Sequence, residues 1–329
     1  MKEDNAIATG EVTSNVQKGK FLKTQVTPVE PYDPEALIEV QHLTKCFGTL
    51  KVLDNISHKI YKGERIAIIG PSGSGKSTFL RCLNVLEDPT DGYVFFGGKN
   101  LCDFKVDINE QRRRMGMVFQ HFNLFNNLTI LGNIILAPVT AAKIERKRAK
   151  KLNALKAKYA AASDEQKAIL ASKAAKLSGE PVDLTAPPAP IRTNAEIKQA
   201  ATDKAMALLT RIGLADKANV YPSTLSGGQK QRVAIIRALA MDHEALLFDE
   251  PTSALDIEMV KEVLSLIQTL ADEGMTMVIV THELKFARSF ASRVLFMDGG
   301  TILESGTPDD IFGNPQAERL KTFLNQVSD

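Results

Sequence analysis

The residues with the clearest chemistry lie in the segment 65–80, which reads RIAIIGPSGSGKSTFL. Within it, residues 70–77 fit the pattern G-x-x-x-x-G-K-[ST] of a phosphate-binding loop. The short apolar run 66–69 before the loop is typical of a buried parallel strand, and a helical apolar pattern begins at Phe79. The loop therefore joins a strand to a helix, which is the context that phosphate binding requires.

Each residue type in this loop has a physical reason to be there. Gly70, Gly73 and Gly75 let backbone N–H groups turn towards one point without Cβ atoms in the way. The helix that begins near Lys76 adds its positive N-terminal dipole, and the lysine can place a charge on the terminal phosphates of a nucleotide. The Ser77 hydroxyl can ligate Mg²⁺. The alternative is a Gly-rich turn that only closes a strand–helix unit.

The elements that must position this chemistry are further strands. Four polar or ionisable residues follow the ends of short apolar runs: Gln120, Asp249, Glu250 and His282. Strands that alternate with helices predict an α/β core with a mostly parallel sheet. Ligands of such folds bind at the carboxyl ends of the strands, so these residues can converge with Lys76 on one site. For Asp249 and Glu250 the alternative is a solvated strand end without chemical function.

Composition limits the class of protein. With 329 residues the chain can form one large domain or two ordinary ones. Its 41 basic and 39 acidic residues nearly balance, which argues against a dedicated nucleic-acid binder. No apolar run reaches the roughly 18 residues of a membrane span. Cys46, Cys82 and Cys102 have no metal-ligand spacing, and we expect reduced thiols rather than disulfides.

Phe47 lies in a predicted turn before the phosphate loop. An aromatic ring there can stack on a purine base. The alternative is an ordinary core or turn phenylalanine, and position alone favours that alternative. At the start of the chain, residues 1–36 are polar and weakly patterned, and we expect a flexible N-terminal tail.

The segment 143–190 differs in composition from the rest of the chain. Ala and Lys dominate, and the stretch from Lys143 to Lys176 contains eleven Lys or Arg residues but only three acidic residues. Ser163 with Gln166, and Thr193 with Glu196, form capping-box patterns that start new helices. We expect a helical hairpin with a break near Ser163, followed by a Pro-rich return.

Together with the segment LSGGQ at residues 225–229, the motifs resemble the ATP-binding subunit of an ABC transporter. The resemblance covers roughly residues 37–139 and 200–329. It implies that nucleotide is contacted by Phe47, Gly70, Pro71, Ser72, Gly73, Ser74, Gly75, Lys76, Ser77, Thr78, Gln120, Ser226, Gly227, Gly228, Gln229 and Asp256. It further implies magnesium contacts from Ser77, Gln120 and Asp249, and catalytic roles for Glu250 and His282. For Phe47 it favours stacking on adenine.

The fold implied is a P-loop NTPase core with a mostly parallel sheet, an antiparallel β subdomain and an α-helical subdomain. It would occupy residues 37–329, with the helical subdomain at about 123–242 and an Ala/Lys-rich insertion at about 143–190. The family's mechanism implies ATP and Mg²⁺ held between two copies arranged head to tail. Each ATP would lie between one copy's phosphate loop and the other copy's signature at residues 225–229.

The resemblance also implies partners and location. The ATPase would dock on integral membrane permease subunits at the cytoplasmic side of the inner membrane, as a peripheral protein. A periplasmic or extracellular substrate-binding protein would take part indirectly, and nucleic acid would not. The excess of bases in 143–190 favours a solvated face, and the alternative is contact with anionic lipid headgroups or with an acidic patch of the permease.

A narrower resemblance is to the ATPases of bacterial polar amino-acid importers. It depends on residues 119–125, 136–138, 248–256 and the ending 311–324. The alternatives are the ATPase of an ABC exporter or of a lipid- or lipoprotein-extracting system, and, less favoured, a soluble ABC protein that does not transport. One departure from the family is that 106 positions separate Gln120 from Ser226, several tens more than usual, so no function is carried over for the insertion.

Overall fold

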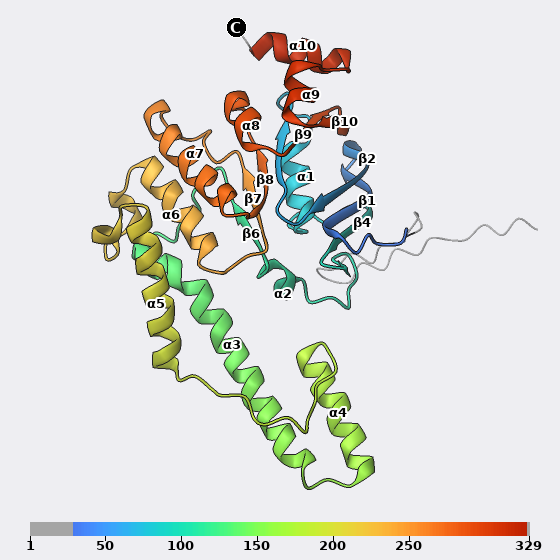
Figure 1. Cartoon of the computed structure of the whole chain (residues 1–329), viewed down its shortest axis with the longest axis vertical. Coiled ribbons are helices and arrows are strands. Elements are labelled where there is room, and N and C mark those ends of the chain that lie inside the picture. The colour runs from blue at the N-terminus through green and yellow to red at the C-terminus, as the bar shows by residue number, and fades with distance from the viewer. Residues whose placement is uncertain (1–28, 328–329) are drawn as a thin grey trace, which may run out of the picture.

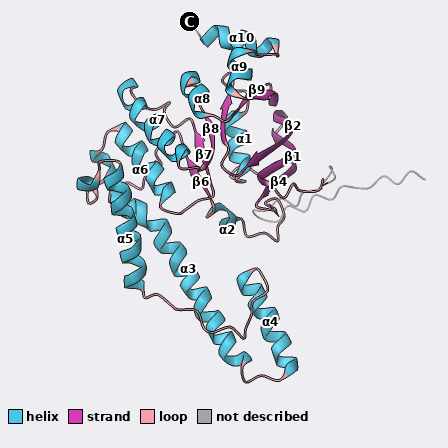
Figure 2. Ribbon diagram, viewed as in Figure 1, coloured by secondary structure: helices cyan, strands magenta, loops and turns pink. Residues whose placement is uncertain are grey.

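The core of the protein is a six-stranded sheet with the order β10-β9-β3-β8-β7-β6, seen in a computed structural model that describes residues 29–327 (Figures 1 and 2). Four neighbouring pairs are parallel, and only β9 and β10 pair antiparallel. The strands are β3 (Arg65–Ile69), β6 (Met115–Val118), β7 (Ala245–Asp249), β8 (Thr276–Val280), β9 (Arg293–Asp298) and β10 (Thr301–Gly306). All five residues of β7 and of β8 are buried, as expected for strands covered on both faces.

Alternate residues of each central strand enter two separate hydrophobic cores. In β3, Ile66 and Ile68 join one core, whereas Ala67 and Ile69 join the other. The first core holds α1 (Lys76–Leu83) and an antiparallel sheet, and the second holds α7 (Ile257–Asp272) and α8 (Leu284–Phe290). Because the sheet is sandwiched, its carboxyl edge is the place where side chains can leave the core.

The antiparallel sheet has the order β2-β1-β4-β5. It is formed by β1 (Ala36–Phe47), β2 (Leu50–Tyr61), β4 (Asp91–Phe96) and β5 (Lys99–Asn100). Irregularities in the register of β1 against β2 keep both strands continuous for 12 residues, longer than the apolar runs suggest. Phe47 is consequently the last residue of β1 rather than a turn residue.

The helical subdomain extends away from the sheets. It contains α3 (Ile130–Tyr159), α4 (Asp164–Ser178), α5 (Asn194–Arg211) and α6 (Gly227–Leu239). Both predicted capping boxes are present, Ser163 with Gln166 before α4 and Thr193 with Glu196 before α5. The expected hairpin is therefore formed by the outer half of α3 and by α4, which ends at Gly179 in the left-handed conformation (φ 84°). Figure 1 shows this hairpin at the end of the molecule opposite α10 (Glu318–Val327).

The remaining helices are short: α2 (Ile108–Arg112) lies just before β6, and α9 (Pro308–Gly313) follows β10. The predicted α/β core with its antiparallel and helical subdomains is confirmed.

Of the expected tail, residues 1–28 lie outside the described part. From residue 29 on the chain is fixed, because the Glu30 N–H donates to Gln41 Oε1 (3.0 Å) and the Asp33 N–H to Glu39 Oε2 (2.8 Å). The tail boundary expected at residue 36 was thus too late.

Within residues 29–327, no helix is both long and apolar enough to cross a bilayer. No disulfide joins Cys46, Cys82 or Cys102 in the described part of the chain.

Candidate nucleotide-binding and hydrolysis site

The phosphate loop lies between β3 and α1, as predicted. Gly70 and Gly75 have positive φ angles of 147° and 97°. A Cβ on Gly70 would lie 2.0 Å from the Met297 carbonyl oxygen, and one on Gly75 would lie 2.8 Å from Leu53 Cδ2. The loop is therefore pressed between β9 and β2, and only glycine fits at these two positions.

Lys76 is buried and its ammonium lies over the loop. It donates to the carbonyl oxygens of Gly70 (2.9 Å) and Pro71 (2.8 Å). Burial lowers its pKa, while the negative charges of Glu250 and Asp249 act in the opposite direction. Ser74 Oγ is buried and has no hydrogen-bond partner among the described residues. A cradle without room for Cβ atoms, a fixed cation and an unpaired hydroxyl together fit a chain of phosphates.

Asp249 is the last residue of β7, and its side chain is only 3% exposed. Arg81 of α1 donates to Asp249 Oδ2 from Nε (3.2 Å) and Nη2 (3.0 Å). Ser77 lies one turn before Arg81 and therefore on the same face of α1, the face beside β7. A carboxylate and a hydroxyl are hard oxygen donors, so Ser77 and Asp249 fit Mg²⁺.

Glu250 and His282 lie at the ends of the neighbouring strands β7 and β8 and contact each other. Glu250 Oε1 is 3.2 Å from His282 Nε2. Glu250 has a left-handed backbone (φ 47°), and its N–H donates to the Val280 carbonyl oxygen (3.0 Å). This turn brings the carboxylate out of the sheet, with one face open to solvent where a water molecule can bind. A carboxylate paired with an imidazole can polarise and orient that water.

Gln120 lies two residues beyond β6 and is half-buried. The residues around it border a groove of about 470 Å³, which is lined by Phe119, Asn123 and Leu136 among others. Gln231 Nε2 of α6 donates to the Phe119 carbonyl oxygen (3.3 Å) and so joins the end of β6 to the helical subdomain. Gln120 thus follows directly on a residue that is bound to α6.

The segment 226–229 begins α6. Ser226 is the N-cap, its Oγ accepts from the Gln229 N–H (3.3 Å), and Gln229 Oε1 accepts from the Ser226 N–H (3.1 Å). Ser226 and Gln229 are therefore engaged in closing the N-terminal end of the helix. The Gly228 N–H donates to Met259 Sδ (3.0 Å), and a Cβ there would lie 2.8 Å from Met259 Cβ. Tight packing on α7 accounts for the glycine.

Phe47 is 46% exposed at the tip of the β1–β2 hairpin, so the core alternative is wrong. The Lys45 ammonium lies 4.5 Å from its ring centroid. The next strand, β2, contacts the phosphate loop through Val52 and Leu53 at Gly75. The ring is thus a solvent-accessible aromatic surface on the hairpin that packs against the loop.

The structure brings together one part of the predicted site and not the other. Lys76, Asp249, Glu250 and His282 share the carboxyl edge of β3, β7 and β8. Gly228 packs on Met259 of α7 and Gly227 lies against Leu255 just before that helix. No hydrogen bond within residues 29–327 joins Ser226, Gly227 or Gly228 to the phosphate loop. Asp256 is the exposed N-cap of α7. Ser72 is exposed, whereas Pro71 and Thr78 are half-buried beside the loop.

Sequence reasoning missed Arg81. The signal that could have found it is a cation on a short, otherwise mostly apolar helix directly after the phosphate loop. Such a helix packs on the sheet, so its one arginine needs an acidic partner there.

Comparison with known proteins identifies the family. The model of the ABC transporter family matches residues 53–253. The arginine transport ATP-binding protein ArtM of Bacillus subtilis (strain 168) is 45% identical over 291 residues, 88% of this chain and 100% of that protein. The glutamine transport ATP-binding protein GlnQ of Geobacillus stearothermophilus is 43% identical over 88% of this chain and 99% of its own length.

Among solved structures, the dimeric post-hydrolysis state of an ATP-binding cassette bound to ADP and Pi is similar. It has a TM-score of 0.59 and 29% identity, over 82% of this chain and 98% of that one. The fold, the phosphate loop and these matches lead to one conclusion: the chain belongs to the ABC transporter family.

Proposed function

We propose that this chain is the ATP-hydrolysing subunit that powers import of a polar amino acid through a separate membrane permease. The observation that carries the proposal is the contact of Glu250 with His282 (3.2 Å) at the strand edge that also holds Lys76 and Asp249. A phosphate cradle beside a polarised water site is the arrangement that hydrolysis of a nucleoside triphosphate needs.

In this proposal the residues act mainly by position and charge. Lys76 and the loop N–H groups bind the terminal phosphates, and Phe47 stacks on the adenine. Glu250 accepts a hydrogen bond from the attacking water, and His282 holds that water in line with the γ-phosphate. Fixed donors aimed at the developing charge supply most of the rate in such reactions.

Mg²⁺, when bound, neutralises phosphate charge and draws electrons from the bond that breaks. Ser77, Asp249 and Gln120 are the proposed residues for it. Asp249 suits an outer position, through water, because its side chain is nearly buried and is shared with Arg81. Gln120 would report the state of the site to the helical subdomain, since the carbonyl of Phe119 beside it is bound by Gln231 of α6.

A second copy is proposed to complete each site. The N-terminus of α6, closed by the Ser226–Gln229 box, has no hydrogen bond to the chain's own phosphate loop among the described residues. A helix N-terminus favours an anion, so Ser226, Gly227 and Gly228 would bind the γ-phosphate of the other copy, with Gln229 and Asp256 beside them. The dimeric state of the similar ATP-binding cassette supports this arrangement.

The groove beside Gln120 is the proposed dock for the permease. It is lined by apolar and cationic side chains, including Phe119, Leu136 and Arg112. Closing the dimer would move α3 relative to β6 and change the width of this groove, which converts hydrolysis into movement of the permease. The chain would then lie on the cytoplasmic side of the membrane as a peripheral subunit, and a substrate-binding protein would deliver the amino acid from outside.

Import of an amino acid is supported by relatives whose names all refer to amino-acid transport, at 40–45% identity over 88–89% of this chain. Nothing in the site favours an exporter or a lipid-extracting ATPase.

The test is the substitution Glu250→Gln, measured as ATP hydrolysis and as ATP-dependent dimerisation by size-exclusion chromatography. The variant should bind ATP, stop turning over and accumulate as a dimer with ATP and Mg²⁺. Glu165→Gln, at an exposed position of α4, is the matched control and should behave as wild type. Hydrolysis at the wild-type rate by Glu250→Gln would refute the assignment. Uptake of labelled amino acids into vesicles that contain the permease tests the transport part.

A further inference from the structure

The basic residues of α3 separate into two sets. Three of them are held inside the protein: Arg146 Nη1 donates to Asn194 Oδ1 (2.9 Å), Arg148 Nη1 to Glu110 Oε1 (3.1 Å), and Lys156 Nζ to the Pro187 carbonyl oxygen (3.0 Å). They bind α3 to α5, to α2 and to the returning chain. These contacts explain three of the basic residues of α3, and the other basic residues of the helix make no such contact within residues 29–327.

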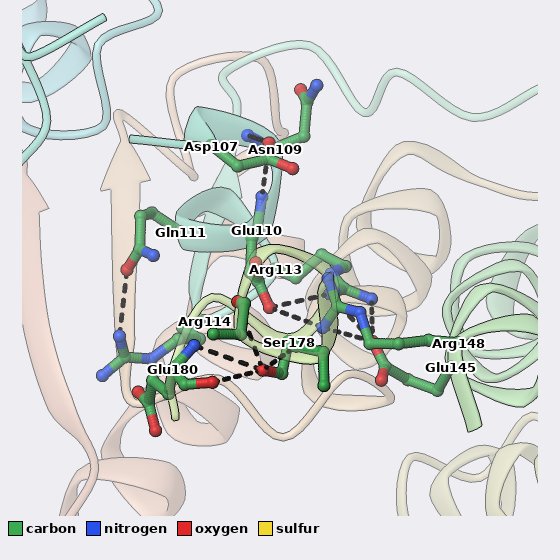
Figure 3. A network of polar contacts seen from close by, with 12 residues as sticks. Asp107, Asn109, Glu110, Gln111, Arg113, Arg114, Glu145, Arg148, Ser178 and Glu180 are labelled. Atoms are coloured by element: carbon green, nitrogen blue, oxygen red, sulfur yellow. Dashed lines mark hydrogen bonds and ion pairs between the residues drawn. The ribbon is translucent and has the colours of Figure 1, made fainter. Parts of the chain in front are cut away.

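An ion-pair cluster fixes the orientation of α3 at its middle. Arg113, next to α2, contacts Glu145 (3.2 Å) and Glu110 (3.6 Å), and Arg148 contacts both of these acids (3.7 and 3.1 Å). Figure 3 shows the four side chains converging between α2 and α3. Because two acids and two arginines alternate around one point, α3 cannot rotate about its axis without breaking several contacts at once.

The second set of bases lies on a different face of α3. Lys143, Lys147, Lys150, Lys151 and Lys158 are all exposed, and none of their ammonium groups has a partner within residues 29–327. We call them the α3 lysine stripe. With 3.6 residues per turn, they occupy an arc of roughly 100° around the helix and extend about 22 Å along it. The ion-pair cluster lies outside this arc and fixes the direction in which the stripe faces. Lys158, at its outer end, also borders a hollow beside α4.

The stripe continues the groove beside Gln120. Leu136 lines that groove, is 42% exposed, and falls within the same arc of α3 two turns before Lys143. The groove and the α3 lysine stripe therefore face the same side of the molecule.

We propose that the α3 lysine stripe binds the anionic phospholipid headgroups of the membrane beside the permease. This rests on the proposed function, which places the groove against a membrane protein. An anionic bilayer surface attracts basic segments electrostatically and requires charge rather than geometry. Lysine is a hydrated point charge, whereas arginine suits bidentate recognition of a fixed partner. On this helix the arginines are used for the internal contacts, and the outward stripe contains only lysine.

The composition of the stripe also defines the mode of binding. Ala154 and Ala157, beside the outer lysines, are small, and the exposed large apolar side chains near the stripe are Leu136 and Ile144 towards its inner end. Binding therefore depends mainly on charge. No aromatic residue alternates with the lysines, which sets the stripe apart from a surface that stacks nucleic-acid bases. The contact is therefore peripheral, reversible and weakened by salt.

The experiment is co-sedimentation of the full chain with vesicles, without permease or nucleotide. One set is phosphatidylcholine alone, and the other contains equal parts of phosphatidylcholine and phosphatidylglycerol. Wild type should bind the second set and release on addition of salt. One lysine near an anionic surface is worth about fivefold in partitioning, so two lysines in contact already account for about 25-fold. Changing all five lysines of the stripe to Gln should therefore reduce binding by more than about 20-fold.

The matched control changes five exposed lysines elsewhere to Gln, Lys62, Lys99, Lys198, Lys261 and Lys285, with the same loss of charge. It should keep most of the binding. Equal binding of wild type to both vesicle sets, or equal losses in the stripe and control variants, would overturn the proposal. So would a stripe variant that binds anionic vesicles normally but loses affinity for permease held in phosphatidylcholine, since the partner would then be protein. Basal ATPase activity, measured separately, should be unchanged in both variants. If wild type itself shows no basal ATPase activity, that result counts against the proposed function and not against lipid binding by the stripe.

Discussion

Arg81 donates two hydrogen bonds to a single oxygen of Asp249: its Nε (3.2 Å) and its Nη2 (3.0 Å) both bind Oδ2. The aspartate is nearly buried, while the arginine is 43% exposed. A buried carboxylate needs a compensating charge, and here that charge comes from the helix of the phosphate loop itself. The divalent cation proposed for this site would therefore act on the same carboxylate as the arginine.

The first prediction is that Arg81→Met destabilises the protein and that Mg²⁺ restores part of the loss. Asp249 without its partner should cost about 1–3 kcal/mol, less than a fully buried pair because the arginine is partly solvated. Urea unfolding with EDTA and then with Mg²⁺ measures both effects. Arg81→Lys is the control, because it keeps the charge and loses the fork. Equal stability of Arg81→Met and wild type in EDTA would show that Asp249 does not depend on Arg81.

The second prediction concerns the proposed action of Ser226 on the other copy. A mixed dimer with Lys76→Ala in one copy and Ser226→Arg in the other should keep one intact site, because both changes then fall on the same nucleotide. Trapping of nucleotide after mixing should give one molecule per dimer. Each variant alone, as a homodimer, should trap none. A mixed dimer that also traps none would contradict the head-to-tail arrangement.

The third prediction is that the hairpin is dispensable for nucleotide chemistry. Of its hydrophobic residues only Ala174 and Leu184 are buried, so removing it exposes little apolar area. The boundary follows from the structure: Glu145 and Arg148 contact α2, and Arg146 contacts Asn194 at the start of α5. Replacing residues 152–190 with a short Gly/Ser linker should therefore preserve basal ATPase activity and stability to within about 1 kcal/mol.

The wider replacement of residues 143–190 serves as the comparison. It removes the ion-pair cluster as well, so it should lower the unfolding temperature further than the narrow one. Loss of basal ATPase activity in a folded narrow variant would show that the hairpin belongs to the catalytic machinery. Permease-stimulated activity of the same variants reports whether the hairpin has a role in coupling.

The fourth prediction is acid sensitivity from two buried histidines. Desolvation lowers the pKa of His58 and of His243 to about 4, compared with 6.5 for an unperturbed side chain. Between these values the unfolded chain binds a proton that the folded chain does not. Stability is therefore complete above 6.5 and falls as the pH drops towards 4, by about 2 kcal/mol per histidine at about pH 5.

His243→Gln should flatten this dependence in urea unfolding experiments near pH 7 and about pH 5, after any constant loss from repacking is subtracted. His121→Gln, at an exposed position, is the matched control and should leave the pH dependence unchanged. An unchanged difference between the two pH values in His243→Gln would mean that this histidine binds its proton equally well in the folded and the unfolded chain.

Local sequence patterns predicted the elements that carry the site because glycine spacing, apolar runs and capping boxes are local signals. The loop before Lys76, the strand that ends at Asp249 and the start of α5 at Thr193 all follow such signals. Contacts between distant segments left no comparable signal. The bond from Arg81 to Asp249 joins residues 168 positions apart, and the Met259 sulfur that receives the Gly228 N–H lies on another helix.

Phe47 illustrates the same limit. Its position gave no means of distinguishing a core residue from an exposed one, since the irregular register of β1 against β2 decides where the ring points. The ordering of residues 29–36 was missed for a related reason: Glu30 and Asp33 are held by side chains of the adjoining strand and not by a pattern of their own.

The capping box of Thr193 and Glu196 gives α5 a starting point of its own, next to Arg146 of α3. The chain therefore leaves the helical subdomain and re-enters it at adjacent places. The segment between these two places is not needed for α3 or α5 to form. Such a junction can gain or lose whole segments in evolution without penalty to the host. The turn between α3 and α4, at residues 160–163, forms the outer end of the hairpin and is therefore a natural place to insert a fluorescent reporter (Figure 1).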